Sequence, residues 1–76
     1  MYYELKPMRN NQKSYYGKAH VQVDYNGAET LYSYDTKIIT RDTDGTLVKH
    51  WDGWSITTGK HIYEFCGLRK KDYEKL

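Results

Sequence analysis

Residues 15–25 show the clearest alternation of hydrophobic and polar positions in the chain. The apolar residues stand at every second position, namely Ala19, Val21, Val23 and Tyr25. A period of two is typical of a β-strand with one face on a core. The pair Asn26-Gly27 follows directly and suits the positive φ angles of a two-residue type I′ turn, so we expect a hairpin here.

Three more strands are predicted after this turn. Residues 29–34 form the return strand, residues 37–41 a third, and residues 46–51 a fourth, with an Asp-Gly turn at 42–45 between the last two. Ile38 and Ile39 are adjacent and both apolar, so the pattern leaves open which of them faces the core. The short reversals favour an antiparallel meander.

A short amphipathic helix is predicted after the strands. Ser55 and Thr57 are both candidate N-caps, and with Thr57 as the cap the helix runs over about 58–66. Gly67 is expected to end it, and Gly59 weakens it slightly.

The predicted fold class is therefore α+β, with a four-stranded antiparallel meander sheet and one C-terminal helix packed on one face (ββββα). Residues 70–76 have the length for a further short helix, anchored by Tyr73 and Leu76. Residues 1–14 contain Pro7 and a polar run, which predicts a flexible or loosely docked arm that could add an edge strand if docked. Residues 15–76 are expected to form a single α+β domain.

Tyrosine dominates the hydrophobic residues of this 76-residue chain, with nine tyrosines against one phenylalanine. Tyrosine buries its ring and keeps its hydroxyl near water, so the rings could surround a small core or form a binding face. The lone Cys66 allows no internal disulfide, and no signal peptide or membrane span is visible. We therefore expect a soluble cytoplasmic protein with no membrane partner.

The positive charge is concentrated at the two ends of the chain. Residues 1–14 carry Lys6, Arg9 and Lys13, and residues 69–76 include Arg69, Lys70 and Lys71. If these ends meet beside the neighbouring tyrosines, they could bind nucleic acid by phosphate neutralisation and stacking. If they do not meet, they are two solvated, polar termini.

The chain shows no motif for catalysis or metal binding. The soft metal ligands lack zinc-site spacing; they are His20, His50, His61 and Cys66. Ser55 and His61 lie six residues apart, but no glycine-flanked nucleophile elbow surrounds Ser55. We therefore predict no enzyme activity, no catalytic residue, no metal and no cofactor.

Trp51 and Trp54 flank a turn at Gly53, next to the predicted helix. They could form an exposed aromatic surface for a base or a peptide. In a domain this small, at least one of them is expected to cap the core between sheet and helix instead.

Two stretches resemble a family of short proteins from bacteriophages and prophages. The first reads Leu31-x-Ser33-Tyr34-x-Thr36, and the second reads Trp51-x-Gly53-Trp54-Ser55-x-Thr57-Thr58-x-x-His61-Ile62-x-Glu64-Phe65. The resemblance covers roughly residues 17–76 and includes a lysine-rich end. It implies a phage-type accessory protein and assigns no catalytic residue.

These observations favour a small non-enzymatic protein that acts by protein–protein contact. The phage lifestyle implied by the resemblance suggests an anti-CRISPR-like inhibitor in the host cytoplasm, whose partner is a host protein, such as a nucleic-acid-dependent defence complex. The alternative is a nucleic-acid-binding accessory protein, and the chain could be a monomer or a homodimer paired through edge strands. The expected partner-binding residues lie on the open sheet face and its rim: His20, Tyr32, Tyr34, Trp54, Arg69 and Lys70.

Overall fold

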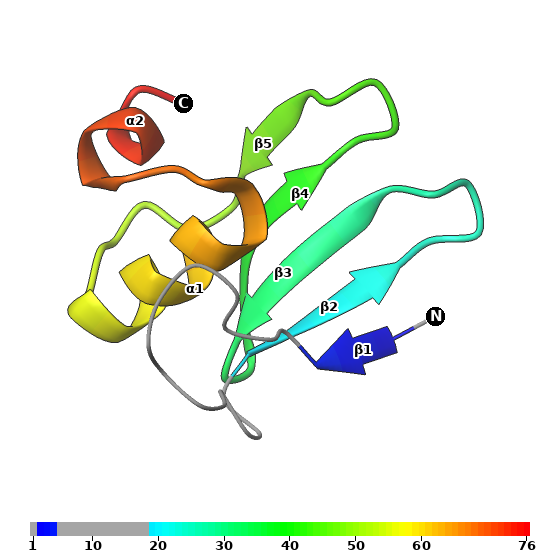
Figure 1. Cartoon of the computed structure of the whole chain (residues 1–76), viewed down its shortest axis with the longest axis horizontal. Helices are drawn as coiled ribbons and strands as arrows, with labels where there is room; N and C mark the ends of the chain where they lie inside the picture. The colour runs from blue at the N-terminus through cyan, green and yellow to red at the C-terminus, as the bar shows by residue number, and fades with distance from the viewer. Residues whose placement is uncertain (1, 5–18) are drawn as a thin grey trace.

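A five-stranded antiparallel sheet and two helices make up the fold, as a computed structural model of residues 2–4 and 19–76 shows (Figure 1). The strands lie side by side in chain order, which is a meander: β1 (Tyr2–Glu4), β2 (Ala19–Val23), β3 (Glu29–Ser33), β4 (Thr36–Arg41) and β5 (Leu47–Lys49). Helices α1 (Ile56–Cys66) and α2 (Lys70–Glu74) follow. The α+β class and the meander are confirmed.

The predicted count of four strands is wrong, because the first residues of the expected arm form β1. Tyr2, Tyr3 and Glu4 pair antiparallel with residues 20–22 of β2. A three-residue edge strand is too short to show a period of two, and its partner supplies most of what holds it. Residues 5–14 of the predicted arm lie outside the described residues.

The predicted hairpin between β2 and β3 is confirmed, but its turn type is wrong. A type I′ turn needs positive φ at both central residues, whereas in this loop only Gly27 has it, at +97°. The Gly27 amide donates to Asp24 O and the Asp24 amide to Ala28 O, both at 2.9 Å, so three residues form the loop. This is the pattern of a tight turn followed by a left-handed glycine.

The hairpin between β4 and β5 repeats this geometry. Gly45 has φ of +90°, its amide donates to Asp42 O, and the Asp42 amide donates to Thr46 O. The Asp44 carboxylate accepts from the Thr46 amide at 2.9 Å. Both loops therefore follow from one four-residue sequence pattern, Asp-x-Asn/Asp-Gly.

A β-bulge in β4 resolves the ambiguity at Ile38 and Ile39. Ile39 pairs with Leu31 and Lys37 pairs with Tyr32, so Ile38 is an extra residue without an opposing partner in β3. A bulge breaks the strict alternation of faces. Both isoleucines are consequently buried, at 1% and 0% exposure.

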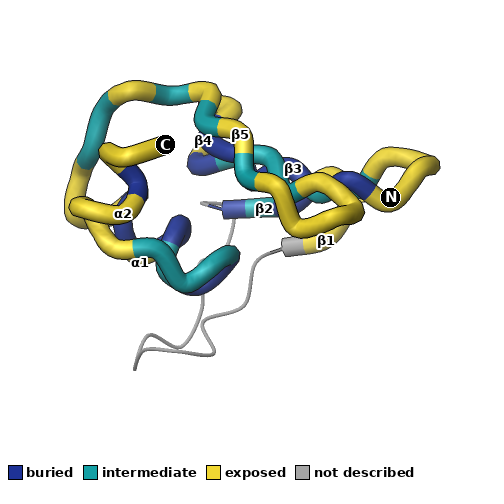
Figure 2. Tube along the Cα trace, turned by 90° about the horizontal axis from the view of Figure 1, so that it is seen from above, coloured by how far each residue is buried: buried dark blue, intermediate teal, exposed yellow. Residues whose placement is uncertain are grey.

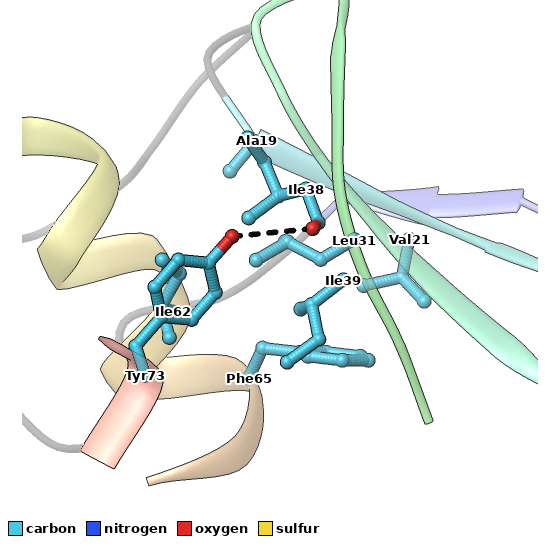
Figure 3. Packing of buried hydrophobic residues seen from close by; sticks show 8 residues of the cluster. All are labelled: Ala19, Val21, Leu31, Ile38, Ile39, Ile62, Phe65 and Tyr73. Atoms are coloured by element: carbon cyan, nitrogen blue, oxygen red, sulfur yellow. Dashed lines mark hydrogen bonds between the residues drawn. The ribbon is translucent and has the colours of Figure 1, made fainter. Parts of the chain in front are cut away.

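The core lies between one face of the sheet and the two helices, as Figures 2 and 3 show. Ile62 and Phe65 of α1 and Tyr73 of α2 meet the inward side chains of the strands, which are Ala19, Val21, Leu31, Ile38 and Ile39. The Tyr73 hydroxyl donates to Ile38 O and to Trp51 O, so the ring is buried without leaving its polar end unpaired.

The ends of α1 match two of the predicted signals. Ser55, and not Thr57, is the N-cap: its Oγ accepts from the Thr58 amide at 3.1 Å, so the helix begins two residues earlier than expected. Gly67 ends it as predicted, with φ of +77°. In the predicted second helix Tyr73 is the anchor, while Leu76 is 44% exposed and does not serve as one.

The strand register shows which residues lie on the sheet face opposite the core. Val21 and Leu31 point to the core, so the alternation turns His20, Gln22 and Tyr32 to the opposite side, which we call the outer face. The two helices lie on the core side, where Ile62 and Phe65 of α1 and Tyr73 of α2 belong to the core cluster.

A polar chain ties β1 to the rest of the sheet and to α1. The Tyr3 hydroxyl donates to Glu29 Oε2 at 2.8 Å, and Arg41 donates to Glu29 Oε1 at 2.9 Å. Arg41 also donates to Phe65 O at 2.8 Å and lies 4.5 Å from the centre of its ring. Burial opposes the ionisation of Glu29, but the hydrogen bonds from Arg41 and Tyr3 leave its pKa lowered.

The hydrogen bond from Tyr3 to Glu29 predicts a specific loss of stability at alkaline pH. Burial and the hydrogen bond to Glu29 raise the pKa of Tyr3 from 10.0 to about 12. As the pH rises past about 10 the unfolded chain loses its proton first, so stability present at lower pH is lost through about pH 12. Over this pH range, the free energy of unfolding measured with urea should fall more steeply for the wild type than for Tyr3→Phe.

The comparison with Tyr3→Phe removes other alkaline effects, such as the raised pKa of Tyr73, because both proteins share them. If the free energy of unfolding fell equally with pH in both proteins, β1 would not hold Tyr3 against Glu29 in solution.

Candidate binding groove beside helix α1

A groove runs along α1 to the start of α2. Its volume is about 380 Å³, within the range of small ligand sites. Eight residues line it: Trp54, Ile56, Gly59, Lys60, Tyr63, Leu68, Arg69 and Lys70. We call this the α1–α2 groove. Its lining residues belong to the segment that leads from β5 into α1, to α1 and to the segment that enters α2. Figure 1 shows these helices on one side of the sheet.

The Trp54 ring forms part of the groove by lying against Gly59. A Cβ atom at Gly59 would come 2.5 Å from Cζ2 of this ring, which is closer than real atoms approach. The same ring lies 5.6 Å from the ring of Tyr73. Gly59, interpreted from the sequence as a weak point of the helix, is therefore the residue that lets the indole approach α1 so closely.

The rim of the groove is basic. Lys60, Arg69 and Lys70 are exposed, and no Asp or Glu is among the lining residues. The Arg69 guanidinium lies 5.3 Å from the centre of the Tyr63 ring, which orients it along the groove wall. Ile56 is 81% exposed at the first turn of α1, so the rim also offers an apolar side chain.

The six residues predicted to bind a partner fall into separate places. Trp54, Arg69 and Lys70 line the α1–α2 groove together, on the helical side. His20 and Tyr32 face each other across β2 and β3 on the outer face, with ring centres 5.0 Å apart and planes 5° from parallel. The structure therefore groups three of the six in one groove and places two on the opposite side of the sheet.

On the outer face, Tyr2 extends the ring pair of His20 and Tyr32. The Tyr2 ring lies 4.7 Å from the His20 ring, so three rings stand in a row across β1, β2 and β3. His20 and Tyr32 turn their faces toward each other. A nucleobase needs a ring face to stack on, and in this pair those inner faces are already in contact.

Tyr34, the sixth predicted residue, occupies the turn between β3 and β4. It has φ of +56°, the only positive value among the non-glycine residues that the structure describes. Bulky residues rarely adopt this conformation. Its side chain is half exposed, and its ring lies 6.3 Å from the ring of His61.

A buried polar cluster joins β3 to α1 beneath Tyr34. The Ser33 hydroxyl lies 2.9 Å from His61 Nδ1 and 3.0 Å from the Thr58 hydroxyl. These side chains are 2%, 0% and 7% exposed, respectively, and none of them lines the groove. A serine beside a histidine resembles a nucleophile and its base, but this pair is closed to a substrate. We therefore interpret the cluster as structural.

The other candidate ligands and nucleophiles have structural contacts as well. Ser55 caps α1 and His50 Nε2 lies 2.7 Å from the Thr40 hydroxyl. The Cys66 thiol donates to Ile62 O at 3.4 Å. Within residues 2–4 and 19–76, no three His, Cys, Asp or Glu side chains gather as a metal site would require. In the same ranges, neither helix has the length and apolar character that crossing a bilayer demands.

Comparison with known proteins places the chain in one family. A family model described as "Family of unknown function (DUF8033)" matches residues 3–75, which is nearly the whole chain. The chain therefore belongs to this family. No curated protein matches it, and no solved structure does.

Replacing Gly59 by Ala should destabilise the protein, although alanine favours a helix by about 1 kcal/mol. The added methyl group must displace the Trp54 ring, and overpacking of this kind costs about 1–3 kcal/mol. Urea unfolding followed by tryptophan fluorescence measures the change. Thr57→Ala is the matched control, because Thr57 is exposed on the same helix turn and should gain or lose no more than about 0.5 kcal/mol. A Gly59→Ala protein as stable as the control would show that Trp54 does not lie on α1.

Replacing His61 by Ala should cost about 2–4 kcal/mol of unfolding free energy. The change leaves a cavity and removes one of the two hydrogen-bond partners of the buried Ser33 hydroxyl. Thermal and urea unfolding report the loss, and His50→Ala, at an exposed histidine, should cost less than about 1 kcal/mol. Similar losses for the two variants would contradict the structural role of the buried cluster.

Proposed function

Because membership of a family of unknown function assigns no activity, we propose a function from the groove. In this proposal the protein is a non-enzymatic binding protein that holds a partner protein in the α1–α2 groove. The observation that carries it is a groove whose lining combines apolar and aromatic side chains with three basic residues, Lys60, Arg69 and Lys70.

The residue types of the groove support protein contact. Tryptophan, tyrosine and arginine are enriched among the residues that dominate binding energy at protein interfaces. Trp54, Tyr63 and Arg69 lie together in the lining. Trp54 is held against Gly59, and Tyr63 carries the Arg69 guanidinium, so these anchors are ordered before a partner arrives. Pre-ordered side chains lose less entropy on binding.

The target class extends this proposal and rests on the sequence resemblance alone. A phage-type protein in the host cytoplasm could block a defence nuclease, such as a CRISPR effector, by covering a surface that the nuclease needs. Such inhibition requires contact and no chemistry.

Nucleic-acid binding through the basic termini is the competing function, and no specific observation favours it. Its N-terminal residues, Lys6, Arg9 and Lys13, lie outside the described residues. The described basic residues Arg69 and Lys70 line the groove, which offers an apolar lining and no row of free ring faces.

Site-specific photo-crosslinking tests the proposal in cells that contain the partner, such as phage-infected or nuclease-expressing bacteria. A photoreactive amino acid at Ile56, in the groove, should capture one protein reproducibly. The same group at Val48, which is exposed on the outer face, should not capture it. Both positions are exposed, so both variants should fold.

The crosslink at Ile56 should disappear when Lys70→Glu is added and persist with Lys71→Glu. Lys71 is the matched control, since it is exposed and adjacent on α2 but does not line the groove. Capture at Val48 alone, or of nucleic acid alone at Ile56, would overturn the proposed function.

A further inference from the structure

We propose that the segment held in the α1–α2 groove is acidic and inserts one bulky apolar side chain, with carboxylates on either side of it. This inference rests on the proposed function and specifies the chemistry of the partner. It is argued from the charge, the shape and the ring contacts of the lining residues.

All the charged residues that line the groove are basic. Lys60 comes from α1, while Arg69 and Lys70 come from the start of α2. The cations of the groove therefore come from different elements, and no Asp or Glu is among the described lining residues. Charges of one sign in a concave site attract the opposite charge and discriminate against partners of like charge. Acidic residues before and after an inserted side chain would meet one wall each.

The groove has enough room for a bulky apolar side chain. Its volume of about 380 Å³ is at the lower end of the range of ligand sites. The lining between the cations is apolar, from Trp54, Leu68 and the exposed Ile56. Burying an apolar side chain here would remove its surface from water, which favours binding.

The ring contacts favour a protein segment over a nucleobase. The Tyr63 ring already carries the Arg69 guanidinium on one face, and the Trp54 ring lies against Gly59 with Tyr73 nearby. Single-strand binders instead keep successive ring faces open for stacking. An apolar side chain needs no open ring face, because it can contact ring edges and aliphatic groups.

Four fluorescent probes of matched length test the inference against the full chain. They are an acidic peptide with a central leucine, the same peptide with serine at its centre, a basic peptide with leucine, and single-stranded DNA. The acidic leucine peptide should bind at least about tenfold more tightly than the other three, because only it satisfies both the rim and the apolar lining.

Charge variants locate that binding. Lys70→Glu should weaken the acidic leucine peptide by about tenfold or more, while Lys71→Glu should change it by less than about threefold, because only Lys70 lines the groove. DNA held by general attraction would respond to both variants alike. Equal responses of the peptide to the two variants would overturn the inference.

Two variants at Ile56 separate charge from apolar contact without harming the helix. The first turn of α1 has no acidic residue, so Ile56→Asp should preserve or improve its stability. Ile56→Asn has the same shape without the charge. Both variants lose the apolar contact, and Ile56→Asp should bind the acidic leucine peptide at least about threefold more weakly than Ile56→Asn because it adds repulsion. Equal binding by the two would count against an acidic occupant.

The outcomes distinguish this inference from the proposed function. Tight binding of the basic peptide, or of the serine peptide, would overturn the acidic, apolar-anchored occupant and leave a protein-binding groove in place. Binding of DNA alone, or of none of the probes, would also overturn it. The proposed function itself fails only when the photoreactive group at Ile56 captures no protein.

Discussion

The hydrogen bond between Ser33 and His61 is the contact on which the arrangement of sheet and helix depends. It joins the last residue of β3 to the middle of α1, within a buried polar cluster between the sheet and the helix. Apolar contacts alone would tolerate sliding of the helix along the sheet, whereas a buried polar pair is costly to separate. With α1 held at this point, Ile62 and Phe65 reach the core and the opposite side of the helix forms the groove.

This contact also explains the structural role of several residues in the stretches 31–36 and 51–65. Ser33, Thr58 and His61 form the buried cluster, Ser55 caps α1, and Phe65 lies in the core. The residues quoted for the resemblance therefore include those that attach the helix to the sheet. They identify a fold, which explains why they indicate no chemistry.

The groove is built largely from positions that the same pattern leaves open. Ile56, Gly59 and Lys60 occupy unspecified places within it. Of these three, Ile56 and Lys60 are exposed, whereas Gly59 is buried and must stay small because the Trp54 ring lies against it. The side of α1 that faces the groove therefore carries residues different from those that contact the core.

The sequence predicts correctly those parts of the fold that depend on a local pattern of residues. The alternation over 19–23, the two glycine turns and the glycine after α1 all act over a few residues, and all were predicted. What it missed depends on distant partners. β1 is a strand because β2 lies beside it, and the bulge at Ile38 exists because both isoleucines can be buried under the helices.

The candidate site divides in the same way. Trp54, Arg69 and Lys70 were selected for being aromatic or basic, and they do share the groove. Ile56, Lys60 and Gly59 were missed, because their role depends on how α1 is rotated against β3. His20 and Tyr32 were assigned to the same surface as Trp54, which required knowing which sheet face the helices cover.

The two glycine loops have a practical consequence. Their tips lie at the end of the sheet remote from α1 and α2, as Figure 1 shows, and a side chain at Gly45 would meet no atom within 4 Å. Exposed loop tips tolerate inserted sequence better than most positions. An epitope or an attachment tag inserted between β4 and β5 would therefore immobilise the molecule through the loop end of the sheet. The end that carries α1 and α2 would stay accessible to the solution.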